Sequence, residues 1–216
     1  MHRPTETRPS ANPIRRPVIV CFSHLRWNLV FQRPQHILTR LLGQYDVMYW
    51  EEPRFEAGAP APRIEWTLLQ DGLARIEPVL PEGLDKAAAD AALAKLLEDT
   101  LAGETRQLVF WYYTPIMLAF SAGITPDLVV YDNMDELANF AFAPHDIERR
   151  EAALLARADV VLCGGRSLYK ARAKRHHNIH CVPSGVDVAH FARGAGGLPT
   201  PADHAALPRP ASASTG

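Results

Sequence analysis

Residues 17–52 read PVIVCFSHLRWNLVFQRPQHILTRLLGQYDVMYWEE, and this stretch indicates the fold class. It opens with the short apolar, β-branched run Val18–Phe22, which predicts a strand. After a polar turn, isoleucine and leucine recur at helical spacing between Pro34 and Gly43, two residues that suit the first turn and the end of a helix. A second strand is expected at Asp46–Glu51. Strand, helix and strand in this order are typical of a parallel sheet.

The same alternation continues towards residue 182. Further strands are expected at residues 64–69, 73–77, 108–112, 128–131, 160–163 and 179–182. Helices are expected at residues 84–101, after Pro115, and at residues 147–157 and 167–175. Residues 54–62, rich in proline, alanine and glycine, are expected to form a loop, and Gln70-Asp71-Gly72 a hairpin turn. The pattern predicts a Rossmann-like α/β fold, with a doubly wound, mostly parallel sheet and helices on both faces.

The composition is that of an ordinary globular domain. The chain has 216 residues, of which 47% are hydrophobic and 22% charged, and this suits one large core. A net charge of −1 gives no global field that would attract nucleic acid or anionic lipid. Cys21, Cys163 and Cys181 are odd in number and lie in apolar runs, which predicts reduced thiols and a cytoplasmic protein. The apolar segments fall well short of the roughly 20 residues that span a bilayer, so any membrane contact is expected to be peripheral.

Three regions are expected along the chain. Residues 1–16 contain four arginines, three prolines and one acid, Glu6, and are predicted to be a disordered basic arm and not a secretory signal. Residues 17–193 are predicted to form the Rossmann-like domain. Residues 194–216 consist almost entirely of small residues and proline, which predicts a flexible tail or a severed linker.

The loop after the first predicted strand carries the first set of candidate site residues. They are Ser23, His24, Arg26, Arg33 and Gln35. Arginine, histidine and aromatic side chains beside a helix N-terminus can hold an anionic or hydroxyl-rich ligand. The alternative is structural: Trp27 and Phe31 fill the edge of the core, and the arginines pair with acids such as Glu51 and Glu52. The glycine-rich fingerprint of dinucleotide-binding proteins is absent from this turn, which argues against a dehydrogenase.

A second candidate group follows the strand that ends at Tyr131. Asp132, Asp135 and Glu136 place three acids at the expected mouth of the sheet, where a carboxylate can accept hydrogen bonds from two sugar hydroxyls or serve as a general base. The structural alternative is that Asp135 caps a helix and Glu136 favours its positive end. We expect Arg26, Arg33 and Asp132 to border a common hollow.

Two further clusters have simpler explanations. Gly164-Gly165 could cradle a phosphate, although a tight turn from strand to helix with close backbone approach explains both glycines. His180 and Cys181 are adjacent on a predicted strand and would point to opposite faces, so no metal site is expected there.

Taken together, the motifs resemble the N-terminal domain of family 4-like GT-B glycosyltransferases. The matching segments are Ser23-His24-Leu25-Arg26-Trp27, Gln32-Arg33-Pro34-Gln35-His36, Glu51-Glu52-Pro53, Tyr131 to Leu137, Ala158 to Val161, Gly164 to Tyr169 and Pro183-Ser184-Gly185-Val186-Asp187. They occur in order between about Pro17 and Phe191, and are specific as a set although no single segment is.

The resemblance implies transfer of a glycosyl group from a nucleotide-sugar co-substrate, often without a metal and with no further cofactor, in a cleft between two Rossmann-like domains. In such enzymes the N-terminal domain mostly contacts the acceptor, a carbohydrate or a lipid-linked molecule. The residues implied to line the cleft for the acceptor or the departing phosphate are Ser23, His24, Arg26, Arg33 and Gln35. Asp132 and Asp135 would lie on its rim, and Ser184, Gly185 and Asp187 would form the turn towards the second domain.

We expect no second sheet that could hold the donor within these 216 residues. We therefore expect little or no transferase activity from this polypeptide alone. One alternative is a binding subunit that docks a separately encoded donor domain, and another is a stand-alone nucleotide or sugar-phosphate binder. A different GT-B enzyme, such as a phosphorylase or an epimerase, also stays open because fold does not fix function.

Overall fold

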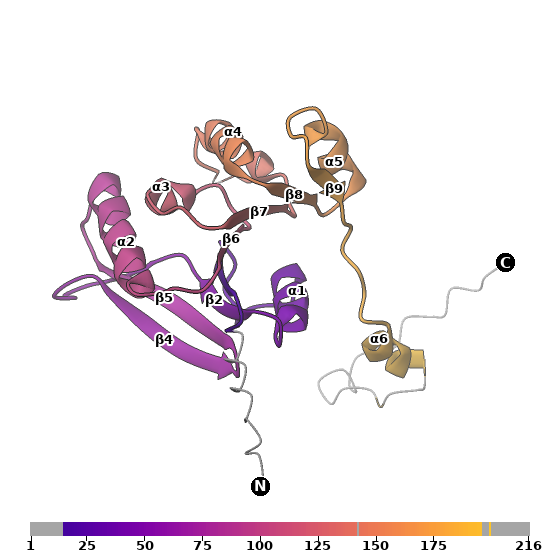
Figure 1. Ribbon diagram of the computed structural model, residues 1–216, viewed down its shortest axis with the longest axis horizontal. Coiled ribbons are helices and arrows are strands. Elements are labelled where there is room, and N and C mark those ends of the chain that lie inside the picture. The colour runs from indigo at the N-terminus through magenta and orange to yellow at the C-terminus, as the bar shows by residue number, and fades with distance from the viewer. Residues whose placement is uncertain (1–14, 142, 196–198, 200–216) are drawn as a thin grey trace, which may run out of the picture. The chain divides into compact units, whose positions relative to one another are not determined.

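The computed structural model describes residues 15–141, 143–195 and 199 (Figure 1). The chain divides into two compact units, residues 1–183 and 184–216, and each is described by itself. The strands of the first unit are β1 (Val18–Phe22), β2 (Asp46–Trp50), β3 (Arg54–Glu56), β4 (Arg63–Gln70), β5 (Leu73–Pro81), β6 (Leu108–Tyr112), β7 (Leu128–Asn133), β8 (Val160–Cys163) and β9 (Ile179–Cys181). Its helices are α1 (Arg33–Leu41), α2 (Lys86–Leu101), α3 (Leu118–Ser121), α4 (Ile147–Arg157) and α5 (Arg166–Arg172), with a 3₁₀ turn, η1 (Leu137–Asn139).

The nine strands form one sheet in the order β3-β5-β2-β1-β6-β7-β8-β9, with β4 paired to β5. The β4–β5 pair is antiparallel and the other pairs are parallel. The predicted mostly parallel, Rossmann-like α/β fold is therefore confirmed. The predicted hairpin is also present, and Gly72 has the positive φ of 75° that favours glycine in its turn.

The prediction of a loop over residues 54–62 is wrong at its start, because Arg54–Glu56 forms β3. Strand β5 continues to Pro81, beyond the predicted end at residue 77, and its extension Val79–Pro81 pairs with β3. This pairing depends on a distant segment, so local composition did not reveal it.

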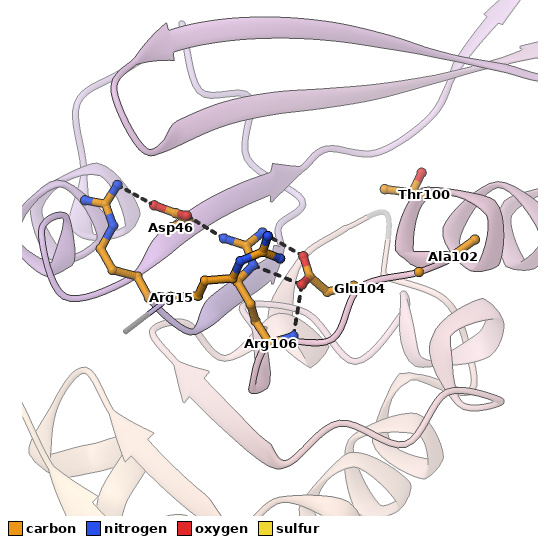
Figure 2. A pocket seen from close by; sticks show the side chains of 8 residues that line it. Arg15, Asp46, Thr100, Ala102, Glu104 and Arg106 are labelled. Carbon is orange, nitrogen blue, oxygen red and sulfur yellow. Dashed lines mark hydrogen bonds and ion pairs between the residues drawn. The ribbon is translucent and has the colours of Figure 1, made fainter. Parts of the chain in front are cut away.

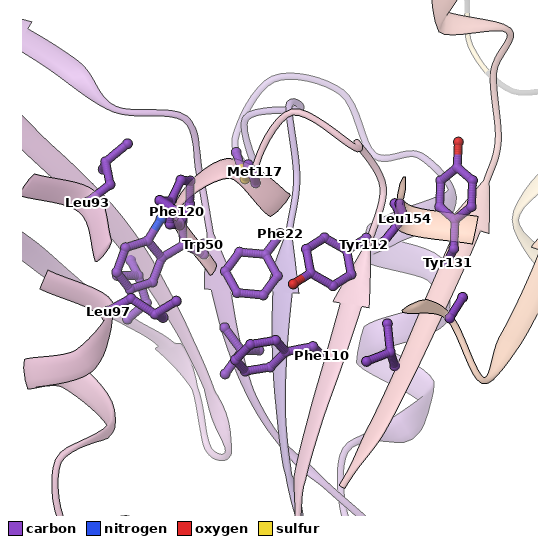
Figure 3. Close-up of a cluster of buried hydrophobic side chains, with 14 of the residues drawn as sticks. Phe22, Trp50, Leu93, Leu97, Phe110, Tyr112, Met117, Phe120, Tyr131 and Leu154 are labelled. Carbon is purple, nitrogen blue, oxygen red and sulfur yellow. The ribbon is translucent and has the colours of Figure 1, made fainter. Parts of the chain in front are cut away.

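The core lies on both faces of the sheet, as a parallel sheet requires. Val18, Val20 and Phe22 of β1 face α2, α3 and α4, whereas Ile19 and Cys21 face α1. Figure 1 shows α2 to α5 on one side of the sheet and α1 on the other. The first side is rich in aromatic rings, which gather around β1 and β6 (Figure 3).

The topology places a switch point at β1. The chain moves from β1 to β2 on one side and later returns with β6 on the other side of β1. The loops that follow β1 and β6 therefore leave the sheet in opposite directions, and a crevice forms at the carboxyl ends of these two strands. In open α/β sheets this crevice is the usual ligand position.

The second unit contains one described helix, α6 (Val188–Ala195). Asp187 accepts a hydrogen bond from the His190 backbone N–H at 3.0 Å, at the start of this helix. Ser184 and Gly185, the other residues of the expected turn between domains, are exposed. Their role as an inter-domain turn stays a prediction. Across the described part of the chain, we find no helix with the length and hydropathy of a membrane span.

Candidate functional site

A pocket of about 520 Å³ opens at the carboxyl ends of the strands, at the switch point. The residues that line it are His24, Leu25, Gln32, Glu52, Thr114, Ile116, Asp135, Leu137, Phe140, Ala143, Pro144 and Ile147. They come from the loops after β1, β2, β6 and β7 and from the first turn of α4. Of the residues predicted from the sequence, His24 and Asp135 line this pocket together.

Ser23 and Gln35 hold the loop that carries His24. The Ser23 hydroxyl oxygen accepts hydrogen bonds from the Leu25 backbone N–H at 3.1 Å and from the Tyr49 hydroxyl at 2.7 Å. The Gln35 amide donates to the backbone oxygens of Trp27 at 2.9 Å and Val30 at 3.0 Å. Both side chains are almost fully buried. They position the loop and do not line the pocket themselves.

His24 contributes an imidazole ring to the pocket lining. Burial lowers the pKa of its imidazole, and the nearby Asp135 carboxylate partly opposes this shift. The ring is therefore neutral at pH 7. Its Nδ1 atom is buried and forms no hydrogen bond with the residues described in the structure. A neutral imidazole with an unused ring nitrogen can exchange hydrogen bonds with a hydroxyl group.

Arg26 forms ion pairs with acidic residues of the protein, which is the structural alternative to a role in ligand binding. Its Nη1 atom lies 3.0 Å from Glu51 Oε2 and 3.1 Å from Glu77 Oε1. The expected partner Glu51 is confirmed, whereas Glu52 turns into the pocket. Burial raises the pKa of the Glu52 carboxyl, and the charge of Arg26 offsets part of this rise.

Arg33 and Asp132 form a buried ion pair. The Arg33 Nε atom donates to Asp132 Oδ1 at 2.9 Å and Oδ2 at 3.0 Å, and Nη2 lies 2.8 Å from Oδ1. Arg33 Nη1 also donates to the Val182 backbone oxygen at 2.8 Å, which ties the start of α1 to the end of β9. Burial raises the pKa of Asp132, and Arg33 opposes this rise. Neither residue lines the pocket, and neither does Arg26, so the three do not border this hollow together.

Several pocket residues were not among the predicted site residues. Glu52 and Thr114 lie just after the ends of β2 and β6. This position after a strand was the feature of the sequence that could have identified them. Leu137, Phe140 and Ile147 lie further along the chain, where only the folded path of residues 134–147 brings them to the pocket.

Glu136 and Gly164 have structural roles nearby. Glu136 accepts two hydrogen bonds from Arg172, at 2.9 and 2.7 Å. It also precedes the 3₁₀ turn η1 at its N-cap position, where its side chain makes no capping hydrogen bond. A Cβ atom on Gly164 would lie 3.1 Å from Met134 Cα. The backbone at Gly164 therefore approaches that of Met134 closely, as predicted for this glycine. No group of three or more His, Cys, Asp or Glu residues with metal-binding geometry occurs in the described residues.

Comparison with known proteins identifies the fold and not the family. No protein-family model and no curated protein sequence matches the chain. A sucrose-phosphate synthase from Thermosynechococcus elongatus matches with a TM-score of 0.58 and 12% identity, over 86% of this chain and 53% of that one. An E. coli structure of trehalose-6-phosphate bound with UDP-2-fluoro glucose matches with a TM-score of 0.56 and 11% identity, over 84% of this chain and 52% of that one. What is shared is the fold, one Rossmann-like half of the GT-B architecture. The chain spans about half the length of both neighbours.

A second hollow of this GT-B-like domain, about 490 Å³, lies at the opposite, amino ends of the strands. Figure 2 shows Arg106 between Asp46 and Glu104. Arg106 Nη1 lies 2.6 Å from Asp46 Oδ2, and Nη2 lies 2.6 Å from Glu104 Oε2. Arg16 also pairs with Asp46, at 2.9 Å. Arg16 and Arg106 are therefore both held by acids, although Arg15 also lines this hollow. Because ligands of open α/β sheets bind at the other end, we assign this hollow a structural role.

Replacing Glu104 with glutamine is expected to lower stability in a pH-dependent way. The hydrogen bonds from Arg106 lower the pKa of Glu104 from 4.5 to about 2. The stabilisation is therefore complete above pH 4.5 and is lost as the pH falls towards 2. At pH 7 we expect a loss of about 1 kcal/mol, measured by thermal unfolding. The difference between the variant and the wild type should disappear near pH 2.

The matched control is Glu98→Gln, which removes an exposed carboxylate from α2. It should change stability little at either pH. A Glu104→Gln difference that stays constant between pH 7 and pH 3 would contradict the assigned role of the Arg106 pair.

Proposed function

We propose that this chain is the acceptor-binding half of a GT-B glycosyltransferase, which transfers a sugar from a nucleotide-sugar donor to a hydroxyl group of a carbohydrate or lipid-linked acceptor. The observation that carries the proposal is the pocket at the switch point, where His24, Glu52 and Asp135 meet. Its volume of about 520 Å³ is in the range of small-molecule sites. The likeness in fold to half of two sugar-transferring enzymes supports the same role.

The lining suits a hydroxyl-rich ligand. The carboxylates of Glu52 and Asp135 can each accept hydrogen bonds from two hydroxyl groups. The neutral imidazole of His24 adds an acceptor or donor without adding charge. Phe140 lines the pocket and is 56% exposed, so its ring is open to an apolar part of the acceptor. Polar groups would orient the acceptor, and the apolar residues would exclude water from it.

The donor would be held by a separate domain. A GT-B cleft has two walls, and the described part of the chain contains one sheet, so this chain would supply the acceptor wall. We expect the isolated chain to bind acceptors but to show little turnover with nucleotide-sugars. Robust transfer by the purified chain with a panel of nucleotide-sugars would contradict this assignment.

The proposal can be tested by saturation-transfer NMR with a panel of alkyl and aryl glycosides. We expect signal transfer to at least one glycoside in the wild type and at least a fivefold weaker signal in Ala143→Trp, because the indole would fill part of the pocket. The matched control is Ala91→Trp on the exposed face of α2. It should leave binding unchanged. Equal binding by both variants would place the ligand elsewhere and contradict the proposal.

A further inference from the structure

The titratable side chains that line the pocket are mainly acidic. Its titratable residues are His24, Glu52 and Asp135, and no lysine or arginine occurs among the described residues that line it. His24 adds no positive charge at pH 7, because burial lowers its pKa. The polar side chains of the pocket therefore supply carboxyl groups and neutral atoms, and no side-chain cation.

Two arginines of the neighbouring β1–α1 segment are held by other acids. Arg26 is the one whose charge reaches Glu52, and its guanidinium pairs with Glu51 and Glu77. Glu77 also lies 3.8 Å from Arg54 Nε, and Arg54 in turn pairs with Glu56 and Glu65, so this guanidinium too is held by acids outside the pocket. Arg33 is buried against Asp132 and has only 4% of its side chain exposed. Neither Arg26 nor Arg33 can turn towards a ligand without breaking these ion pairs.

Most of the residues that line the pocket are apolar. Its apolar residues are Leu25, Ile116, Leu137, Phe140, Ala143, Pro144 and Ile147. Phe140 stays more than half exposed, so an apolar group placed against it would remove hydrocarbon surface from water. Together with the polar lining residues, these apolar residues make the site amphipathic.

We infer that the acceptor is an uncharged glycoside, with free hydroxyl groups on the sugar and an apolar aglycone, and that it carries no phosphate. The hydroxyls would meet His24, Glu52 and Asp135, and the aglycone would lie against Phe140 and its apolar neighbours. A phosphate group in this pocket would face carboxylates without a cation to balance it, and such repulsion acts over a Debye length of about 8 Å at physiological salt. This inference rests on the proposed function, because it names the substrate class of the same pocket.

The test uses two probes that differ by one phosphate, 4-nitrophenyl β-D-glucopyranoside and its 6-phosphate. Each is titrated into the ¹⁵N-labelled chain at low salt, and the backbone shifts of residues 24–25, 114–116 and 135–141 are followed. We expect the neutral glucoside to bind at least fivefold more tightly than the 6-phosphate. The affinity of the neutral probe should not change with salt, whereas that of the 6-phosphate should improve as salt screens the carboxylates.

The variant Asp135→Asn keeps the shape of the side chain and removes its charge. It should narrow the difference between the two probes by at least twofold, mainly through tighter binding of the 6-phosphate. The control variant Glu98→Gln removes an exposed charge on α2 and should leave the difference unchanged.

The results of these titrations distinguish a failure of the uncharged-acceptor inference from a failure of the proposed function. Tighter binding of the 6-phosphate, with shifts at the same pocket residues, would overturn the uncharged acceptor and leave the proposed function standing. If neither probe shifts these residues, while the glycoside panel gives no saturation transfer either, the proposed function and this inference are both wrong.

Discussion

Replacing Arg33 with alanine is expected to lower the free energy of unfolding by about 3–5 kcal/mol, because Asp132 would be left buried and without a cation. Asp132 is completely buried, and Arg33 supplies its ion pair. Urea unfolding followed by tryptophan fluorescence measures this loss. The matched control is Arg149→Ala, which also breaks an ion pair, with Asp146, but starts from a side chain that is 78% exposed. We expect the control to cost much less than Arg33→Ala.

The double variant Arg33→Met/Asp132→Leu separates charge from packing. It removes both buried charges and keeps apolar volume, so it should regain most of the stability lost in Arg33→Ala. A loss below 1 kcal/mol for Arg33→Ala would show that Asp132 does not depend on Arg33. If the double variant were as unstable as the single one, the loss would come from packing and not from the unpaired charge.

Replacing Phe22 with alanine is also expected to cost about 3–5 kcal/mol, because it would open a cavity in the centre of the core. The Phe22 ring is fully buried, stacks on Tyr112 with 4.8 Å between ring centroids, and meets Phe110 edge-on at 5.0 Å (Figure 3). The measurement is the same urea titration. The control is Phe31→Ala, which removes a ring that is 60% exposed and should cost less than about 0.5 kcal/mol.

Comparable losses in the two phenylalanine variants would contradict the position of Phe22 at the centre of the aromatic cluster. Phe22→Leu gives a further check, since it leaves a smaller cavity and should lose less stability than Phe22→Ala.

Most of the fold could be predicted from the sequence, because each parallel strand is buried on both faces and so leaves a short apolar run. The runs at Leu108–Tyr112 and Val160–Cys163 and the helix at Ile147–Arg157 agree with the structure to the residue. Strand β3 was missed because a three-residue edge strand has little pattern of its own and depends on pairing with β5. Local sequence carries no signal for such pairing.

The candidate site could be predicted only in part. The rule that ligand residues follow strands led to His24 and Asp135, which line the pocket. The same rule selected Arg33 and Asp132, which are 99 residues apart in the chain and bind each other in the fold. The sequence shows that an arginine and an aspartate each follow a strand, but not whether the two side chains contact each other. From the sequence alone, a buried ion pair therefore cannot be distinguished from a ligand-binding site.

The most direct test is a crystal structure of the chain with a bound glycoside from the NMR panel. We predict density for the sugar ring among His24, Glu52 and Asp135, with the aglycone against Phe140. Density for the ligand at the amino ends of the strands, near Arg106 and Glu104, would contradict the assignment of the acceptor pocket.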